Sequence, residues 1–182
     1  MSLAEISHRS SHANAILASA NQHLRELLDV PDNYEIIWQQ GGGTAQFSMV
    51  VYNLVAAYVA RGGSVEEMSA DYIVTGGWSK KAYEEAVRLG IGKVNLVADA
   101  RKFNHGKFGV IPAEKDWRLS DPEKTAYLYY CDNETVDGVE FPATLQSVDP
   151  RVPIVCDMSS NILSRKFDVS KFAVVYVFPS YY

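Results

Sequence analysis

Three glycines at residues 41–43 stand where the chain could bind an anion. They lie in the stretch 39–47 (QQGGGTAQF), between a strand-like segment at 34–38 (YEIIW) and an apolar run of helical length at 47–58. Glycine lets the backbone turn sharply, and the first turn of a helix offers unpaired N–H groups and a partial positive charge. The stretch is therefore either a phosphate cradle or an ordinary tight turn between a strand and a helix.

Three further side chains follow strand-like segments and could contact the same ligand. Trp78 lies in a second glycine-bearing turn, 75–79 (TGGWS), where it either packs on the rim of a sheet, the reading that the residues alone favour, or forms a platform for a planar ligand. Thr135 follows the strand-like run 126–131. Asp157 directly follows an apolar run, where a carboxylate is costly unless it is hydrogen-bonded or paired. It is a cap on the next loop or, as we favour, the partner of a cationic ligand atom.

These residues need elements that bring them together, and the hydrophobic pattern supplies them. Three helices are predicted. An apolar stripe between Ala13 and Leu28 indicates the first, with Ser10 or Ser11 as its cap. The second covers 47–58, and the third covers 80–89 with Ser79 as its cap. Alternation of helices and strands predicts an α/β fold with a mostly parallel sheet, whose ligands collect beyond the carboxyl ends of the strands. The predicted strands are 34–38, 70–74, 94–98, 126–131, 152–156 and 172–178.

Composition excludes several classes of protein. A net charge of −5 and a pI near 5.3 argue against a nucleic-acid partner, because no basic stripe can neutralise successive phosphates. The longest apolar run, 49–60, is too short to span a membrane, and the first residues carry no export signal. Cys131 and Cys156 read as buried free thiols of a reducing compartment, and His105 has no metal-ligand spacing around it. We expect a cytoplasmic protein without a metal site.

Several motifs follow one another along the chain: 5–10 (EISHRS), 40–47 (QGGGTAQF), 74–82 (VTGGWSKKA), 130–139 (YCDNETVDGV), 156–165 (CDMSSNILSR) and 168–172 (DVSKF). Together they resemble the phosphoserine aminotransferase family. That resemblance implies homodimeric, pyridoxal-phosphate-dependent transaminases with the large domain of the aspartate-aminotransferase fold (fold type I), a three-layer α/β/α arrangement. It also implies transfer of an amino group between glutamate and 3-phosphohydroxypyruvate (giving phosphoserine) in L-serine biosynthesis, and in some members a role in pyridoxine biosynthesis.

The resemblance also assigns roles to individual residues. Gly43 and Thr44 are expected to hold the cofactor phosphate, and Trp78 to stack on the pyridine ring. Thr135 is expected to hydrogen-bond the ring oxygen, and Asp157 to pair with the ring nitrogen. The substrate contacts fall elsewhere: Arg9 would bind the α-carboxylate with its planar two-pronged donor, while His8 either lies near the substrate phosphate or is simply a residue at a helix start.

The chain departs from the family pattern at both ends. Residues 1–182 are expected to form an incomplete large domain, without the N-terminal Pro-Gly-Pro segment and the C-terminal small domain. By counting, Tyr181 occupies the place of the Schiff-base lysine, so no catalytic residue is assigned. Lys171 is a poor substitute because it precedes the last strand, at the end opposite the cofactor. We therefore expect this chain to be nearly inactive alone.

Two other functions are alternatives to the transaminase. In the first, the chain is a non-catalytic fragment that acts by pairing with full-length subunits. In the second, it is a nucleotide-binding dehydrogenase, but the sequence lacks Gly-x-Gly-x-x-Gly and the acidic residue expected after the next strand.

Overall fold

The computed structural model describes residues 5–40 and 42–178, which form two compact units. The first unit is assigned Met1–Gln39 and Leu163–Ser170, and the second Gln40–Ile162 and Lys171–Tyr182. Gly43, Thr44, Trp78, Thr135 and Asp157 all belong to the second unit, so its fold positions the predicted cofactor contacts.

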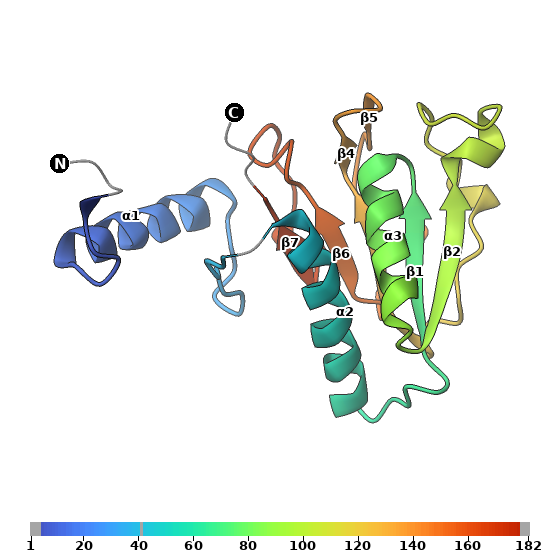
Figure 1. The fold of residues 1–182 in the computed structure, drawn as a ribbon, viewed down its shortest axis with the longest axis horizontal. Helices are drawn as coiled ribbons and strands as arrows, with labels where there is room; N and C mark the ends of the chain where they lie inside the picture. Colours follow the sequence, from blue (N-terminus) through green and yellow to red (C-terminus); the bar gives the residue numbers. More distant parts are fainter. Residues whose placement is uncertain (1–4, 41, 179–182) are drawn as a thin grey trace. The chain divides into compact units, whose positions relative to one another are not determined.

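A five-stranded sheet forms the centre of the second unit (Figure 1). Its strand order is β2-β1-β3-β6-β7, and every neighbouring pair is parallel, which confirms the predicted α/β fold. Strands β1 and β3 are buried along their whole length, as expected where both faces of a parallel sheet are covered. The strands are β1 (Ser69–Val74), β2 (Lys93–Asp99), β3 (Thr125–Cys131), β6 (Ile154–Asp157) and β7 (Val174–Tyr176), with a separate hairpin of β4 (Asn133–Glu134) and β5 (Val139–Glu140).

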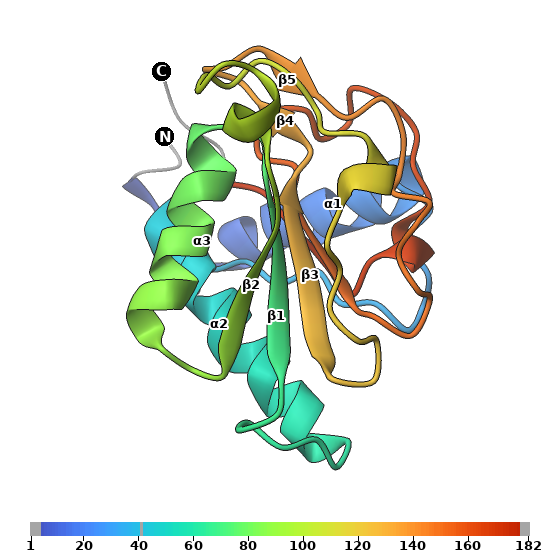
Figure 2. The ribbon, with the colours of Figure 1, turned by 90° about the vertical axis from the view of Figure 1, so that its right-hand side faces the viewer.

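Two α-helices cover one face of this sheet, and irregular segments cover the other (Figure 2). Helix α2 (Gly43–Ala60) precedes the amino end of β1, and α3 (Gly77–Leu89) follows its carboxyl end. Both helices therefore begin at the edge where the parallel strands end. The segment between β2 and β3 includes a short 3-10 helix at the carboxyl end of β2 (Ala100–Phe103) and a second one on the opposite face (Glu114–Asp116).

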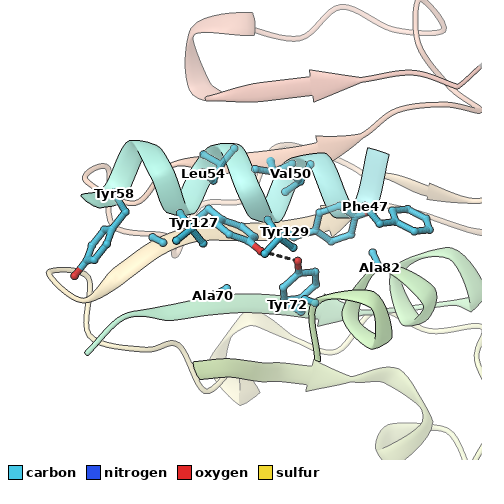
Figure 3. Close-up of a cluster of buried hydrophobic side chains, with 14 of the residues drawn as sticks. Phe47, Val50, Leu54, Tyr58, Ala70, Tyr72, Ala82, Tyr127 and Tyr129 are labelled. Carbon is cyan, nitrogen blue, oxygen red and sulfur yellow. Dashed lines mark hydrogen bonds between the residues drawn. The ribbon is translucent and has the colours of Figure 1, made fainter. Parts of the chain in front are cut away.

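The main core lies between α2 and the sheet (Figure 3). Phe47, Val50 and Leu54 of α2 belong to one buried cluster with tyrosines 72, 127 and 129 of β1 and β3. The Tyr72 and Tyr127 hydroxyls in this cluster are 2.8 Å apart. Burial of these apolar side chains supplies the main driving force for packing the helix on the sheet. No helix in the described ranges is both long enough and apolar enough to cross a membrane.

The first unit corrects one sequence prediction. Helix α1 (Ser11–Leu27) is capped by Ser10, whose side chain accepts a hydrogen bond from the Ala13 N–H, as expected. The predicted strand at 34–38 is wrong, because this segment has no regular secondary structure and exposes Ile37 and Trp38. Its polar groups instead bind α1: the Trp38 indole donates to Asn21 at 2.6 Å, and Arg25 donates to the Tyr34 carbonyl at 2.7 Å.

Candidate functional site

The first turn of α2 is open to an anion. Its N-cap, Gly42, is in an extended conformation (φ −164°), gives no side-chain cap, and is followed by no acidic residue in the first turn. Within the described ranges, the N–H groups of Gly43 and Thr44 have no acceptor. An uncapped helix start with exposed Thr44 beside it has the donors that a phosphate needs. Gly41, the first glycine of the turn, lies outside the described residues.

The second glycine-bearing turn is closed by the protein's own carboxylates. Glu134, fully buried, accepts hydrogen bonds from the Trp78 N–H at 2.8 Å and the Ser79 N–H at 2.7 Å, and another from the Ser79 hydroxyl. Asp137 accepts one from the Gly77 N–H at 2.8 Å. The predicted cap at Ser79 is therefore wrong: α3 begins at Gly77, and acids from the loop after β3 occupy its first turn. An external anion has no place there.

Glu134 and Asp137 are residues that the sequence analysis missed. A run of acids directly after a buried strand (132–137, DNETVD) could have signalled them, but their partners lie 55 to 60 residues earlier in the chain. The pKa of Glu134 is raised by burial, which opposes the effect of its bonds from Ser79 and Trp78. Glu134 also has a geometric consequence, because it immediately precedes Thr135 and binds the backbone of Trp78. Two of the predicted cofactor contacts are therefore connected by one side chain.

Trp78 and Thr135 are both accessible to a ligand at this edge. Thr135 is exposed, and the Trp78 side chain is 39% exposed, with the Lys81 ammonium 4.4 Å from its ring centroid. The partly exposed indole is thus available as a platform, although it also supports a cation–π contact with Lys81.

Asp157 ends β6 and has one acceptor position left. Its Oδ1 accepts hydrogen bonds from the Ser159 N–H at 2.9 Å and the Ser159 hydroxyl at 2.6 Å. Its Oδ2 accepts one from the Tyr176 hydroxyl at 2.9 Å. A carboxylate accepts about four hydrogen bonds, so Oδ2 can take one more donor. Asp157 is buried but still partly accessible to a ligand, since 6% of the residue is exposed.

Short contacts join Asp157 to the other groups at this edge. The Ser159 hydroxyl that binds Asp157 also accepts from the Phe178 N–H at 2.9 Å, and the Phe178 ring lies 4.0 Å from the point where a Cβ of Gly42 would be. On the other side, Asn133 and Ser160 exchange two hydrogen bonds of 3.0 Å between the loops after β3 and β6. The start of α2, Asp157 and the loop of Thr135 therefore form one connected rim.

Comparison with known proteins shows which family this chain belongs to. The sequence model of the protein family "Aminotransferase class-V" matches residues 2–181. The chain belongs to the class-V aminotransferase family. It is 46% identical over 178 residues to a phosphoserine aminotransferase of Saccharomyces cerevisiae, covering 96% of this chain and 44% of that protein. It is 47% identical over 176 residues to the phosphoserine aminotransferase of Drosophila melanogaster, covering 97% and 43%.

Solved structures agree with the sequence relatives of this class-V aminotransferase. A pyridoxal-phosphate-bound phosphoserine aminotransferase of Trichomonas vaginalis matches with a TM-score of 0.79 and 37% identity, over 96% of this chain and 44% of that one. The phosphoserine aminotransferase of Bacillus circulans subsp. alkalophilus matches with a TM-score of 0.80 and 34% identity, over 97% and 44%. The chain thus spans less than half of each of these relatives.

The remaining predicted residues of this chain belong to the first unit, lie at the opposite edge of the sheet, or fall outside the described residues. Arg9 and His8 belong to the first unit, where both are exposed and the Arg9 Nε lies 3.4 Å from the His8 Nε2. Their predicted contacts with substrate stay predictions. Lys171 precedes the amino end of β7, opposite the rim, as expected. Tyr181, the expected position of the Schiff-base lysine, lies outside the described residues.

Proposed function

We propose that this chain is the cofactor-binding part of a phosphoserine aminotransferase. It would serve the transfer of an amino group between glutamate and 3-phosphohydroxypyruvate, giving phosphoserine for L-serine biosynthesis in the cytoplasm. The observation that carries the proposal is the pairing, on one rim, of a helix start without its own acid and an aspartate with one free acceptor position. Those two features suit the two ends of pyridoxal phosphate, an anionic phosphate and a ring nitrogen that can carry a proton.

The residues of the rim would share the work of holding the cofactor. The N–H groups of Gly43 and Thr44, with the Thr44 hydroxyl, would hold its phosphate, and Asp157 would accept the ring N–H with the free position on Oδ2. When bound, pyridoxal phosphate supplies a ring that withdraws electrons from the carbon bonded to the reacting amine. Asp157 would keep the proton on the ring nitrogen, and Trp78 would cover one face of the ring and exclude water from it.

Thr135 and the first unit would complete the assignment. Thr135 would donate a hydrogen bond from its hydroxyl to the ring oxygen. Its neighbour Glu134 binds the Trp78 N–H and so holds Thr135 close to Trp78. Arg9 would bind the carboxylate of the amino acid, and His8 would contact the phosphate of the substrate. Residues 1–182 would be part of the large domain of the enzyme. Because a phenol cannot form an imine, Tyr181 would leave the cofactor bound without a covalent link, and we expect little turnover from this polypeptide by itself.

One observation also supports the proposed homodimer. Helix α2 contains no charged residue along its 18 positions, yet Tyr52 is 55% and Val59 is 44% exposed. An uncharged helix with exposed large apolar side chains is typical of a surface that another subunit covers. The same surface would serve a fragment that pairs with full-length subunits, and mixing this chain with such a subunit, followed by size-exclusion chromatography, separates the two cases.

A binding titration tests the proposal. Pyridoxal 5′-phosphate added to the 182-residue protein should quench tryptophan fluorescence and show saturable binding. Asp157→Asn should weaken that binding at least tenfold, because a charge-assisted hydrogen bond becomes a neutral one. Asp168→Asn is the matched control, since Asp168 lies in the first unit, accepts hydrogen bonds from Ser170, and is not among the predicted cofactor contacts. Saturable binding that is equally strong in both variants would refute the assignment of Asp157.

A further inference from the structure

Two buried tyrosines are connected to Asp157 by hydrogen bonds. Tyr176 on β7 is the register partner of Asp157 on β6, so their side chains lie on the same face of the sheet. The Tyr176 hydroxyl is 2.9 Å from Asp157 Oδ2, and the Tyr129 hydroxyl is 2.7 Å from the Tyr176 hydroxyl. Tyr129 is fully buried and Tyr176 nearly so. The three groups form a single hydrogen-bonded line that leads from the core to the rim.

The direction of these hydrogen bonds follows from the number of protons. Each phenol carries one hydroxyl proton, and an ionised carboxylate can only accept. The Tyr176 proton therefore points to Asp157, which leaves the Tyr176 oxygen to accept the proton of Tyr129. Burial raises the pKa of both phenols well above the ordinary value, so both remain neutral donors at neutral pH. Every dipole in the line thus points its positive end toward Asp157.

Ring contacts hold this line in place. The Tyr129 ring is stacked on the Tyr72 ring at 5.1 Å between centroids, and lies 6.4 Å from the Tyr176 ring at an angle of 30°. Figure 3 shows Tyr72 and Tyr129 below α2, packed between that helix and the sheet. Side chains packed in this way have little freedom, so the Tyr176 hydroxyl keeps a constant position relative to the Asp157 carboxylate.

We propose that Tyr176 and Tyr129 are positioning residues that hold Asp157 as an oriented anion for the ring nitrogen of the cofactor. Ser159 occupies Oδ1 and Tyr176 occupies one side of Oδ2, so the remaining acceptor position on Oδ2 has one direction. The donated hydrogen bond from Tyr129 polarises the Tyr176 hydroxyl and strengthens its bond to the carboxylate. A carboxylate stabilised in this way leaves the shared proton on the ring nitrogen. The inference rests on the proposed function, because it assigns these tyrosines to the same cofactor site.

The same core contains a matched control. Tyr127 is as deeply buried as Tyr129, and its hydroxyl makes a hydrogen bond of 2.8 Å with Tyr72. Tyr127→Phe thus deletes a buried, hydrogen-bonded phenol oxygen that makes no hydrogen bond to Asp157 or Tyr176. If the tyrosines only fill the core, then Tyr176→Phe, Tyr129→Phe and Tyr127→Phe will behave alike.

The first measurement needs no cofactor. Buried hydroxyl protons exchange slowly enough to be observed by proton NMR in the ligand-free protein. We expect Tyr129→Phe to remove its own hydroxyl resonance and to shift that of Tyr176 upfield, and Tyr176→Phe to remove or shift both. Tyr127→Phe should leave both resonances unchanged. A Tyr176 resonance that does not respond to Tyr129→Phe would overturn the proposed line of hydrogen bonds.

The second measurement compares two ligands, pyridoxal 5′-phosphate and its analogue with a C–H group in place of the ring nitrogen. Tyr176→Phe should weaken binding of the true cofactor about tenfold, the usual effect of losing a hydrogen bond to a charged group. Tyr129→Phe should weaken it only about twofold, since it acts through polarisation. Binding of the analogue should not change. In Tyr176→Phe, the ring-nitrogen resonance of ¹⁵N-labelled cofactor should also move toward its unprotonated value.

The outcomes separate this inference from the proposed function. If the parent protein binds the cofactor and Asp157→Asn weakens it, while Tyr176→Phe matches Tyr127→Phe in affinity and ¹⁵N shift, the role of the tyrosines is refuted and the function stands. If the parent protein binds neither ligand, the proposed function fails and the inference fails with it. Equal weakening of both ligands by Tyr176→Phe would indicate a merely structural effect and would also overturn the inference.

Discussion

The two glycines that precede α2 and α3 should differ strongly in how much stability the same substitution costs. Gly42 and Gly76 are both N-caps with nearly identical extended backbones, at φ −164° and −165°. Alanine adopts this conformation readily, so backbone strain plays no part. A Cβ at Gly42 would lie 4.0 Å from the Phe178 ring, an ordinary contact. A Cβ at Gly76 would lie 2.5 Å from Cγ and Cδ of Glu134 and 2.6 Å from Oδ2 of Asp137. We predict that Gly76→Ala is strongly destabilising and Gly42→Ala is not.

The loss of stability in Gly76→Ala can be estimated from the hydrogen bonds that Glu134 accepts. Its carboxylate is fully buried and bound to the backbone of Trp78 and Ser79, so it cannot move aside without breaking those bonds. Overpacking a well-filled site costs about 1–3 kcal/mol, and each lost hydrogen bond costs about 0.5–1.5 kcal/mol more. With two bonds broken, Gly76→Ala should lower the free energy of unfolding by about 2–6 kcal/mol. The general effect of replacing an N-cap glycine by alanine is common to both variants and cancels in the comparison.

Urea denaturation followed by circular dichroism measures both variants against the parent. A Glu134→Ala/Asp137→Ala background supplies a further check, because removing both side chains removes the clash, and Gly76→Ala should then add less than about 1 kcal/mol. If Gly76→Ala and Gly42→Ala change the free energy of unfolding equally, the carboxylate of Glu134 does not hold the start of α3 as described.

Two further predictions concern pH. The pKa values of the buried phenols of Tyr72, Tyr129 and Tyr176 are raised mainly by burial, so the unfolded chain loses their protons near pH 10 while the folded chain keeps them. The free energy of unfolding should therefore fall as pH rises above about 10, and phenolate absorbance should appear together with the loss of circular dichroism rather than before it. At acid pH, hydrogen bonds from Arg88 and Ser48 lower the pKa of Glu85 from 4.5 to about 2. The contribution of Glu85 to the free energy of unfolding is therefore fully present above pH 4.5 and is lost as pH falls toward 2. Glu85→Gln should flatten the acid limb of the urea-derived stability curve, Glu84→Gln on the exposed side of α3 should not, and equal curves would contradict the role of Glu85.

Much of the second unit could be predicted from the order of residues, for a local reason. Strands buried on both faces are mostly apolar, and 126–131 and, apart from Asp71, 70–74 meet this condition, so β3 and β1 were found to within one residue. The apolar run 172–178 was too long a prediction for β7, which covers Val174–Tyr176. The segment 34–38 has the same composition as a strand, but a strand also needs a neighbour, and its polar groups bind α1 instead.

By itself, the sequence determined the fold class, the order of elements at the rim, and the candidates Gly43, Thr44, Trp78, Thr135 and Asp157, because each follows a recognisable strand or opens a helix. Only the tertiary structure decided which of the two glycine turns is open to an anion. Glu134 and Asp137 reach back to close the start of α3, and nothing comparable closes α2 in the described part of the chain. It also decided that Asp157 is backed by Tyr176 and Tyr129. Hydrogen bonds between residues 19 to 60 positions apart depend on how strands are ordered in the sheet, and periodicity along one strand carries no record of that order.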